Sequence, residues 1–200
     1  MIASGPALAD SMVIAALGDS LTAGYGLQQE DGFVPQMQAW LTAQGLDVEI
    51  RNAGVSGDTT AGGLARTDWT LTPDVDAMIV ALGGNDLLRG IDPALSRANI
   101  EAILQKAEGA GVSVLVVGMT APGNYGADFK QAFDSMYPEL AEQYGTLYFP
   151  TFFEGLQADG DPAAAQRFMQ GDGIHPNAEG VLRIVDAMGP SIAELVAAID

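Results

Sequence analysis

The sequence predicts one α/β domain, a three-layer α/β/α sandwich built on a flavodoxin-like, doubly wound parallel sheet of about five strands. Three observations favour this class. Short apolar runs alternate with helical patterns along the whole chain, as in βαβ units with parallel strands. Most of these runs are apolar throughout, as expected for strands that helices cover on both faces. The 200 residues and 48% hydrophobic content suit one domain with a sizeable core.

The expected strands are short apolar segments, and the fourth is rich in the β-branched residues that favour strands. In chain order they are residues 12–17, 48–52, 77–82, 112–117 and 146–149. The expected helices lie at residues 33–41, 59–67, 93–110, 127–144 and 178–198. Asp92 and Pro93 suit the cap and first turn of the third helix. Pro138 predicts a kink or break in the fourth helix, and Gly189-Pro190 predicts a break in the last.

Composition and charge exclude several classes of site and partner. The chain has 26 acidic against 8 basic residues, a formal net charge of -18, no cysteine and one histidine. Disulfides, thiolate metal sites and His-rich metal sites are therefore excluded, and we expect neither a metal nor another cofactor. The acidic surface repels nucleic acid and anionic lipid headgroups. It fits either adaptation to salt, which screens the repulsion, or ordinary solubility.

The N-terminus resembles a processed export segment. Pro6-Ala7-Leu8-Ala9-Asp10 is similar to the cleavage site of an export signal, although no basic segment and no full apolar region precede it. We therefore divide the chain into residues 1–10, a flexible tail or truncated signal remnant, and residues 11–200, a single domain. The remnant predicts a periplasmic or secreted protein, with a cytoplasmic one as the alternative. No apolar run reaches the ~18 residues of a membrane span, so we expect no membrane insertion.

The single histidine, His175, restricts the acid–base chemistry open to this chain. No other side chain has an unperturbed pKa near neutrality, so any imidazole chemistry depends on it. His175 lies in Asp172-Gly173-Ile174-His175-Pro176, just before the last helix. Three more polar segments follow the first three strands: Gly18-Asp19-Ser20-Leu21-Thr22-Ala23-Gly24, Asn52-Ala53-Gly54-Val55-Ser56-Gly57-Asp58 and Gly83-Gly84-Asn85-Asp86. Because the functional crevice of such a sheet lies at the carboxyl ends of its strands, we expect these three segments on one rim.

Together, the four segments resemble the four blocks of the SGNH, or GDSL, hydrolase superfamily, in the family's order and across almost the whole chain. Residues 18–24, 82–86 and 173–177 are most similar to the TesA-type group of small bacterial esterases. That group has arylesterase, thioesterase and lysophospholipase activities. The resemblance therefore implies the SGNH hydrolase fold and a hydrolytic activity on esters.

The residues themselves are consistent with a serine hydrolase. Ser20 lies where the first strand turns into a helix, whose free N–H groups suit a developing oxyanion. Serine is a weak nucleophile until a base removes its proton, and His175 is the sole imidazole that could do so. Asp172 could accept a hydrogen bond from the other ring nitrogen and fix the tautomer. The expected catalytic residues are Ser20, Asp172 and His175.

The resemblance assigns the oxyanion hole to the backbone N–H groups of Ser20 and Gly54 and to the side-chain amide of Asn85. Gly54 would allow a close approach to substrate because it lacks a Cβ, and Asn85 offers two N–H donors. Each residue also has a purely structural interpretation: Ser20 and Asp172 as caps, Gly54 and Asn85 as turn residues, and His175 as a helix-entry residue. The structural roles are compatible with the functional ones, but they do not explain why all four segments fall at compatible places in one fold.

The expected substrate pocket is apolar. In TesA-like enzymes the loop that corresponds to residues 87–91 moves over the acyl chain, and residues 119–125, after the fourth strand, should form another wall. The candidate contacts are Leu87, Leu88, Ile91, Pro122, Tyr125 and Ile174. Each also has the simpler interpretation of a core or loop-packing residue.

Apolar walls and an acidic surface favour a small, neutral, hydrophobic ester as the substrate. The phosphates of acyl-CoA would be repelled. The sequence thus predicts a serine esterase for short-to-medium acyl esters, including aryl esters, that acts through an acyl-serine intermediate. Alternatives are an acyl thioesterase or lysophospholipase, and a carbohydrate deacetylase with the same three catalytic residues. A non-catalytic flavodoxin-like module that binds a small anion or nucleotide is disfavoured by the net charge.

Overall fold

The computed structural model describes residues 11–157 and 165–199. These residues form a five-stranded sheet in the order β2-β1-β3-β4-β5, with every neighbouring pair parallel. The strands are β1 (Met12–Gly18), β2 (Val48–Gly54), β3 (Ala77–Ala81), β4 (Ser113–Val117) and β5 (Leu147–Phe149).

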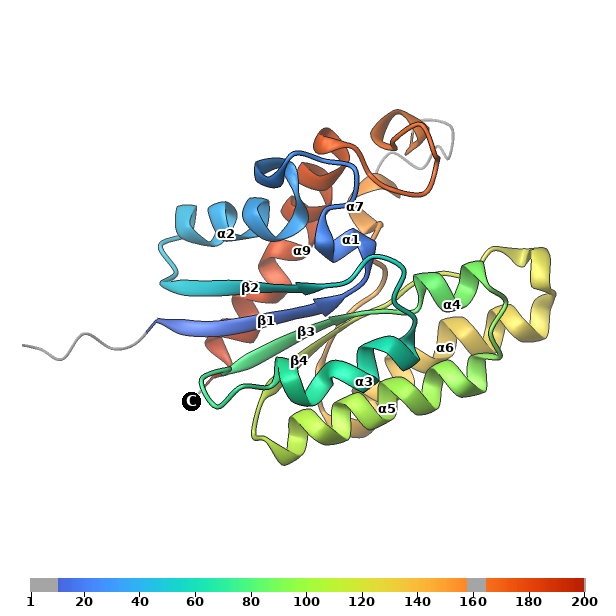
Figure 1. Cartoon of the computed structure of the whole chain (residues 1–200), viewed down its shortest axis with the longest axis horizontal. Coiled ribbons are helices and arrows are strands. Elements are labelled where there is room, and N and C mark those ends of the chain that lie inside the picture. The colour runs from blue at the N-terminus through green and yellow to red at the C-terminus, as the bar shows by residue number, and fades with distance from the viewer. Residues whose placement is uncertain (1–10, 158–164, 200) are drawn as a thin grey trace, which may run out of the picture.

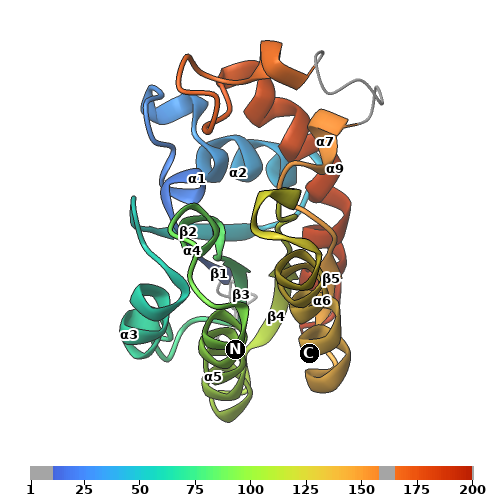
Figure 2. The same ribbon diagram turned by 90° about the vertical axis from the view of Figure 1, so that its right-hand side faces the viewer.

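Helices cover both faces of this sheet, as Figures 1 and 2 show. One face carries α2 (Phe33–Ala43) and α9 (Ala178–Ala197), and the other carries α3 (Thr60–Thr70), α5 (Pro93–Gly109) and α6 (Ala127–Tyr144). Shorter helical segments lie in the connections: α1 (Ser20–Ala23), α4 (Gly84–Leu88), α7 (Glu154–Gln157), η1 (Gln29–Asp31), η2 (Gly123–Tyr125) and η3 (Gln166–Phe168). The predicted α/β/α sandwich with a doubly wound parallel sheet is confirmed.

Several helices begin at a side chain that accepts a hydrogen bond from the first helical turn. These caps are Asp19 for α1, Thr59 for α3, Asp92 for α5 and Asn177 for α9. Such caps satisfy N–H groups that a helix leaves without internal partners. Asp19 directly precedes Ser20, and Asn177 lies two residues after His175. The capped starts of α1 and α9 therefore fix the backbone positions of these two candidate residues.

Neither internal proline breaks its helix, contrary to one interpretation of the sequence. α6 continues through Pro138 and α9 through Pro190, and the short helices α4 and α7 were not expected. Packing explains α9, because Met188 and Ile192 on either side of the proline are fully buried. Burying two such side chains contributes about 3–6 kcal/mol, which offsets the roughly 3 kcal/mol that an internal proline costs.

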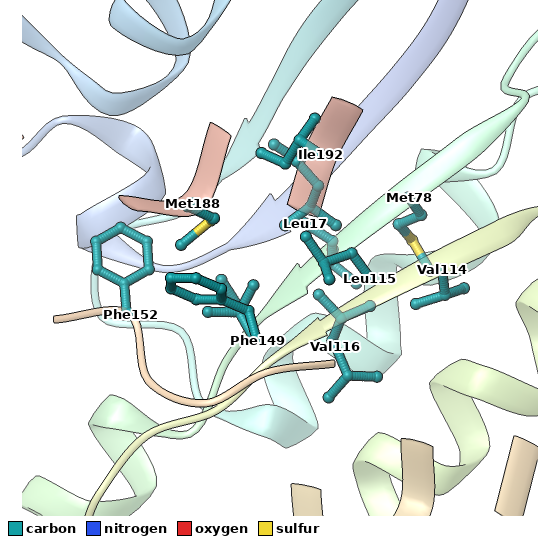
Figure 3. Packing of buried hydrophobic residues seen from close by; sticks show 14 of the residues in the cluster. Leu17, Met78, Val114, Leu115, Val116, Phe149, Phe152, Met188 and Ile192 are labelled. Carbon is teal, nitrogen blue, oxygen red and sulfur yellow. The ribbon is translucent and has the colours of Figure 1, made fainter. Parts of the chain in front are cut away.

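The core continues through the sheet and into the helical layers. Leu17 of β1 and Leu115 of β4 are fully buried and belong to the same cluster as Met188 and Ile192 of α9. Figure 3 shows these side chains together with Phe149 at the end of β5. This packing fixes α9 on the sheet and with it the loop that precedes α9.

The segment expected to be a tail or signal remnant, residues 1–10, lies outside the described residues. Within residues 11–157 and 165–199, no helix is long and apolar enough to cross a membrane.

Truncating Ile192 to alanine should destabilise the fold much more than truncating Leu182, on the same helix. Ile192 is fully buried, whereas Leu182 is 47% exposed. Removing a buried isoleucine side chain costs about 2–5 kcal/mol, and surface changes usually stay within about 0.5 kcal/mol. Urea denaturation of the two variants measures the free energies of unfolding. Equal losses in both would contradict the packing of α9 described above.

Candidate functional site

The candidate site lies where the order of the strands reverses. β1 has β2 on one side and β3 on the other, so the connections that leave β1 and β3 diverge at their carboxyl ends. Parallel α/β sheets bind ligands in the crevice that forms at such a point. Ser20 begins α1 directly after β1, and Asn85 lies in α4 directly after β3. Two of the three strand-following segments therefore meet at this crevice.

A continuous chain of hydrogen bonds joins Ser20, His175 and Asp172. Ser20 Oγ lies 2.8 Å from His175 Nε2, and His175 Nδ1 lies 2.7 Å from Asp172 Oδ2. The other oxygen, Asp172 Oδ1, accepts the backbone N–H groups of Ile174 and His175 at 2.9 and 3.0 Å. The structure thus brings together side chains that are 155 residues apart in the sequence, in the arrangement expected from the sequence segments.

The hydrogen bonds around Asp172 favour its charged form. The imidazole of His175 and then the backbone N–H groups of His175 and Ile174 lower the pKa of the Asp172 carboxyl to about 2. Asp172 therefore remains a carboxylate throughout the pH range in which imidazoles exchange protons. A carboxylate at this position fixes a proton on Nδ1 and leaves Nε2 able to accept one from Ser20.

Asp19 holds the side chain of Asn85. Asn85 Nδ2 donates to Asp19 Oδ2 at 3.2 Å, and the Leu21 N–H donates to Asp19 Oδ1 at 3.0 Å. Asp19 is buried, and this burial raises the pKa of its carboxyl, although the two hydrogen bonds oppose the rise. One amide hydrogen of Asn85 is thereby held in place beside Ser20, and the second amide hydrogen remains a candidate donor to a ligand.

Gly54 does not occupy the position expected of an oxyanion donor. Its N–H donates to Asn52 Oδ1 at 2.9 Å, and it lies outside the lining of the cavity described below. A Cβ at Gly54 would lie 2.4 Å from the backbone nitrogen of Ala23, so the glycine allows the end of β2 to pack against α1. Gly57, in the same loop, does line the cavity, and Arg89 Nη2 donates to its carbonyl oxygen at 2.8 Å.

A cavity of about 570 Å³ opens beside Ser20 and His175. Its volume lies within the range of small-molecule sites. Of the expected contacts, Leu87, Leu88 and Ile174 line it, as do Met119 and Thr120 after β4. Its wall also includes apolar residues that the sequence analysis did not identify: Tyr25, Phe153, Leu156 and Met169. Phe153 and Leu156 follow β5, so the rule that sites form at strand carboxyl ends could have indicated them.

The other three expected contacts lie outside the cavity lining. The Ile91 N–H instead donates to the Asp86 carbonyl at 3.0 Å, which closes the turn after α4. Tyr125 packs its ring against Phe129, with the ring centroids 4.8 Å apart. Pro122 occupies the position just before η2, with no side-chain hydrogen bond to that turn. For these residues the loop-packing interpretation fits the structure. Across the described ranges, no group of three or more His, Cys, Asp or Glu residues could hold a metal ion.

Comparisons with known proteins point to one family. Residues 16–182 match the GDSL-like lipase/acylhydrolase family. The chain is 38% identical to the esterase TesA of Pseudomonas aeruginosa, over 94% of this chain and 91% of that one. It is 34% identical to the thioesterase 1/protease 1/lysophospholipase L1 of Escherichia coli K12, over 95% and 86%. The crystal structure of AlinE4, an SGNH-hydrolase family esterase, aligns with a TM-score of 0.76 at 42% identity, over 94% and 98%.

Replacing Gly54 with alanine should destabilise the protein because the new Cβ meets the backbone of α1. Overpacking of this kind costs typically about 1–3 kcal/mol, which corresponds to roughly 2–4 °C in Tm per kcal/mol for a chain of this size. Gly109→Ala is the matched control, since a Cβ there meets no atom within 4 Å at the end of α5. Thermal denaturation compares the two variants. A Gly54→Ala protein as stable as Gly109→Ala would contradict the packing role.

Proposed function

Because this chain belongs to the GDSL-like lipase/acylhydrolase family and is an ester hydrolase, we propose that it cleaves short-to-medium acyl carboxylic esters, including aryl esters, through an acyl-serine intermediate. The family membership confirms the resemblance that the sequence segments indicate. The observation that best supports the acyl-serine mechanism is the hydrogen-bonded chain Ser20–His175–Asp172. Ser20 and His175 of this chain line an apolar cavity. The roles of the individual residues are part of the proposal.

In the first half of the reaction, Ser20 Oγ attacks the ester carbonyl carbon while His175 Nε2 takes the hydroxyl proton. Asp172, ionised and bound to Nδ1–H, stabilises the imidazolium that forms. The tetrahedral intermediate then collapses, and His175 donates the same proton to the leaving alcohol oxygen. The products of this half are a free alcohol and an acyl group bound to Ser20.

The second half reverses these roles with water as the nucleophile. His175 takes a proton from water, and the resulting hydroxide attacks the acyl-serine carbonyl. Collapse of the second tetrahedral intermediate returns the proton to Ser20 Oγ and releases the carboxylic acid. One imidazole thus serves as base and acid in turn, which suits a chain with a single histidine.

The oxyanion of each intermediate needs donors aimed at it, each typically worth about 2.7–4 kcal/mol of the barrier. We assign the backbone N–H of Ser20 at the start of α1 and the Asn85 amide that Asp19 holds. The sequence pointed to Gly54 as the third donor, but we assign this role to the backbone N–H of Gly57. Gly57 lines the cavity, whereas the Gly54 N–H already donates to Asn52 Oδ1. Arg89 holds the carbonyl of Gly57.

The charges around the cavity favour neutral substrates. In the described part of the chain the cavity wall contains no lysine or arginine, so an anionic leaving group finds no cation there. The net charge of -18 repels such a group further. Leucines, methionines and the rings of Tyr25 and Phe153 contribute apolar surface to the wall, and this surface suits an acyl chain.

Thioester or lysophospholipid hydrolysis is the second candidate, because one relative carries the name thioesterase 1/protease 1/lysophospholipase L1. A carbohydrate deacetylase has less support. Sugar-binding sites usually need aromatic platforms. Neither tryptophan lies in the cavity wall: Trp69 is 86% exposed elsewhere, and Trp40 packs against Gly189 of α9.

Substitutions in the hydrogen-bonded chain should reduce turnover in a definite order. Ser20→Ala and His175→Ala remove the nucleophile and the only imidazole, and we expect kcat to fall by about 10⁶-fold. Asp172→Asn keeps both groups and should cost less, about 10⁴-fold. Turnover of a p-nitrophenyl ester measures all three. Substantial turnover in both Ser20→Ala and His175→Ala would refute the mechanism.

The same variants give a pH test. Because the pKa of Asp172 is lowered to about 2, its charge is present above that pH and is lost only below it. In the wild type, Asp172 should therefore contribute no ionisation to kcat/KM above pH ~4. Asp128→Asn, an exposed acid in the first turn of α6, is the control. An ionisation in kcat/KM above pH ~4 that is present in the wild type and in Asp128→Asn, and is lost only in Asp172→Asn, would contradict the lowered pKa of Asp172.

A substrate series separates acyl length, bond type and charge. We expect short-to-medium p-nitrophenyl esters to have the highest kcat/KM and long-chain esters to have lower values. Acyl-N-acetylcysteamine and acyl-CoA carry the same thioester without and with phosphates, so the first should be the better substrate at low salt. The difference should shrink near 1 M salt, where the Debye length is about 3 Å. Preference for acyl-CoA over the neutral thioester at low salt would overturn the charge argument.

A further inference from the structure

The loop that carries Asp172 and His175 is closed by its own backbone. Met169 and Pro176 form an isolated antiparallel bridge at its base. Inside this bridge, the Gln170 N–H donates to the His175 carbonyl at 2.7 Å, and the Gly173 N–H donates to the Gln170 carbonyl at 3.0 Å. Gln170 therefore sets both the turn and the backbone position of the histidine.

The side chain of Gln170 connects this loop to the segment after Ser20. Gln170 Nε2 donates to the Pro176 carbonyl at 2.9 Å and to the Tyr25 carbonyl at 2.8 Å. The amide also lies closely against the backbone of Gly26, where a Cβ would come within 2.3 Å of Gln170 Oε1. One carboxamide thus bridges two segments that are 145 residues apart.

Tyr25 completes the connection to the reacting groups. Its N–H donates to the Ser20 carbonyl at 3.0 Å. Its ring lies against the imidazole of His175, with the centroids 4.6 Å apart and the planes tilted by 38°. The segment that Gln170 holds is therefore the one that contacts both partners of the Ser20–His175 hydrogen bond.

We propose that Gln170 is a positioning residue that sets the distance and direction between Ser20 Oγ and His175 Nε2, by tying the histidine loop to the Ser20–Tyr25 segment. This inference rests on the proposed function. The Ser20–His175 contact joins the start of α1 to the loop before α9. The sheet does not pair these two segments directly, so a separate connection is needed to hold the contact. A displacement of about 1 Å between reacting groups can cost about 100-fold in rate.

Two substitutions distinguish donation from space filling. Gln170→Ala removes the side-chain amide. Gln170→Glu keeps the size of the side chain but replaces the NH2 group, which donates to two carbonyls, with an oxygen that cannot donate when ionised. We expect kcat to fall roughly 10–100-fold in both variants, with KM changed less than twofold. If Gln170→Glu retained the kcat of the wild type, the amide hydrogens would have no positioning role and the proposal would fail.

Gln38→Ala is the matched control. Gln38 also joins two elements through its amide, donating to the Val48 carbonyl at 2.7 Å and accepting the Ile50 N–H at 2.9 Å. These contacts connect α2 to β2, outside the cavity wall. We expect Gln38→Ala to lower Tm and leave kcat unchanged. A loss of kcat in Gln38→Ala as large as in Gln170→Ala would show that general destabilisation explains both.

The single histidine provides a readout that does not depend on activity. Proton and nitrogen NMR of the imidazole should show an Nδ1–H bound to Asp172 in the wild type, and exchange broadening of that signal in folded Gln170→Ala and Gln170→Glu. An unchanged signal together with unchanged kcat would overturn the proposal. Failure of a fluorophosphonate to label wild-type Ser20 would refute the proposed function instead, and the imidazole signal would still decide the role of Gln170.

Discussion

The parallel pairing of β1 with both β2 and β3 is the constraint on which the site depends. Gly18, the last residue of β1, pairs with Gly54 and with Ala81, so three strands end at one level. A side chain at Gly18 would collide with Thr22 in α1, so its absence allows the chain to turn at once into the helix that carries the serine. Arg66 of α3 secures this junction by donating to the Gly18 carbonyl at 2.7 Å.

Most of the fold follows from patterns that act locally. Continuous apolar runs require cover on both faces, and this requirement alone leads to alternating strands and helices in a parallel sheet. Helix continuity does not follow in the same way. Whether Pro190 ends its helix depends on how tightly Met188 and Ile192 are held by strands far away in the sequence, and no local rule contains that information.

In the candidate site, the reactive residues could be identified from the sequence, but the residues that act through their position could not. The side chains with unusual reactivity could be named from the sequence, since one histidine and one motif leave little choice. The sequence could not decide whether Gly54 or Gly57 donates to the oxyanion. That assignment depends on which backbone N–H already donates to the Asn52 side chain, and only the structure shows that it is the N–H of Gly54. Gln170 was overlooked for the same reason, since its contribution lies in hydrogen bonds to backbone carbonyls and involves no reactive group.

The absence of lysine and arginine from the described cavity wall has a consequence for the end of the reaction. In the proposed hydrolysis a neutral ester enters and a carboxylate is formed. The surrounding negative field is almost indifferent to the ester but repels the ionised acid, so the same surface that admits substrate drives product away. This difference in charge between substrate and product thus speeds product release and limits inhibition by the accumulated carboxylate.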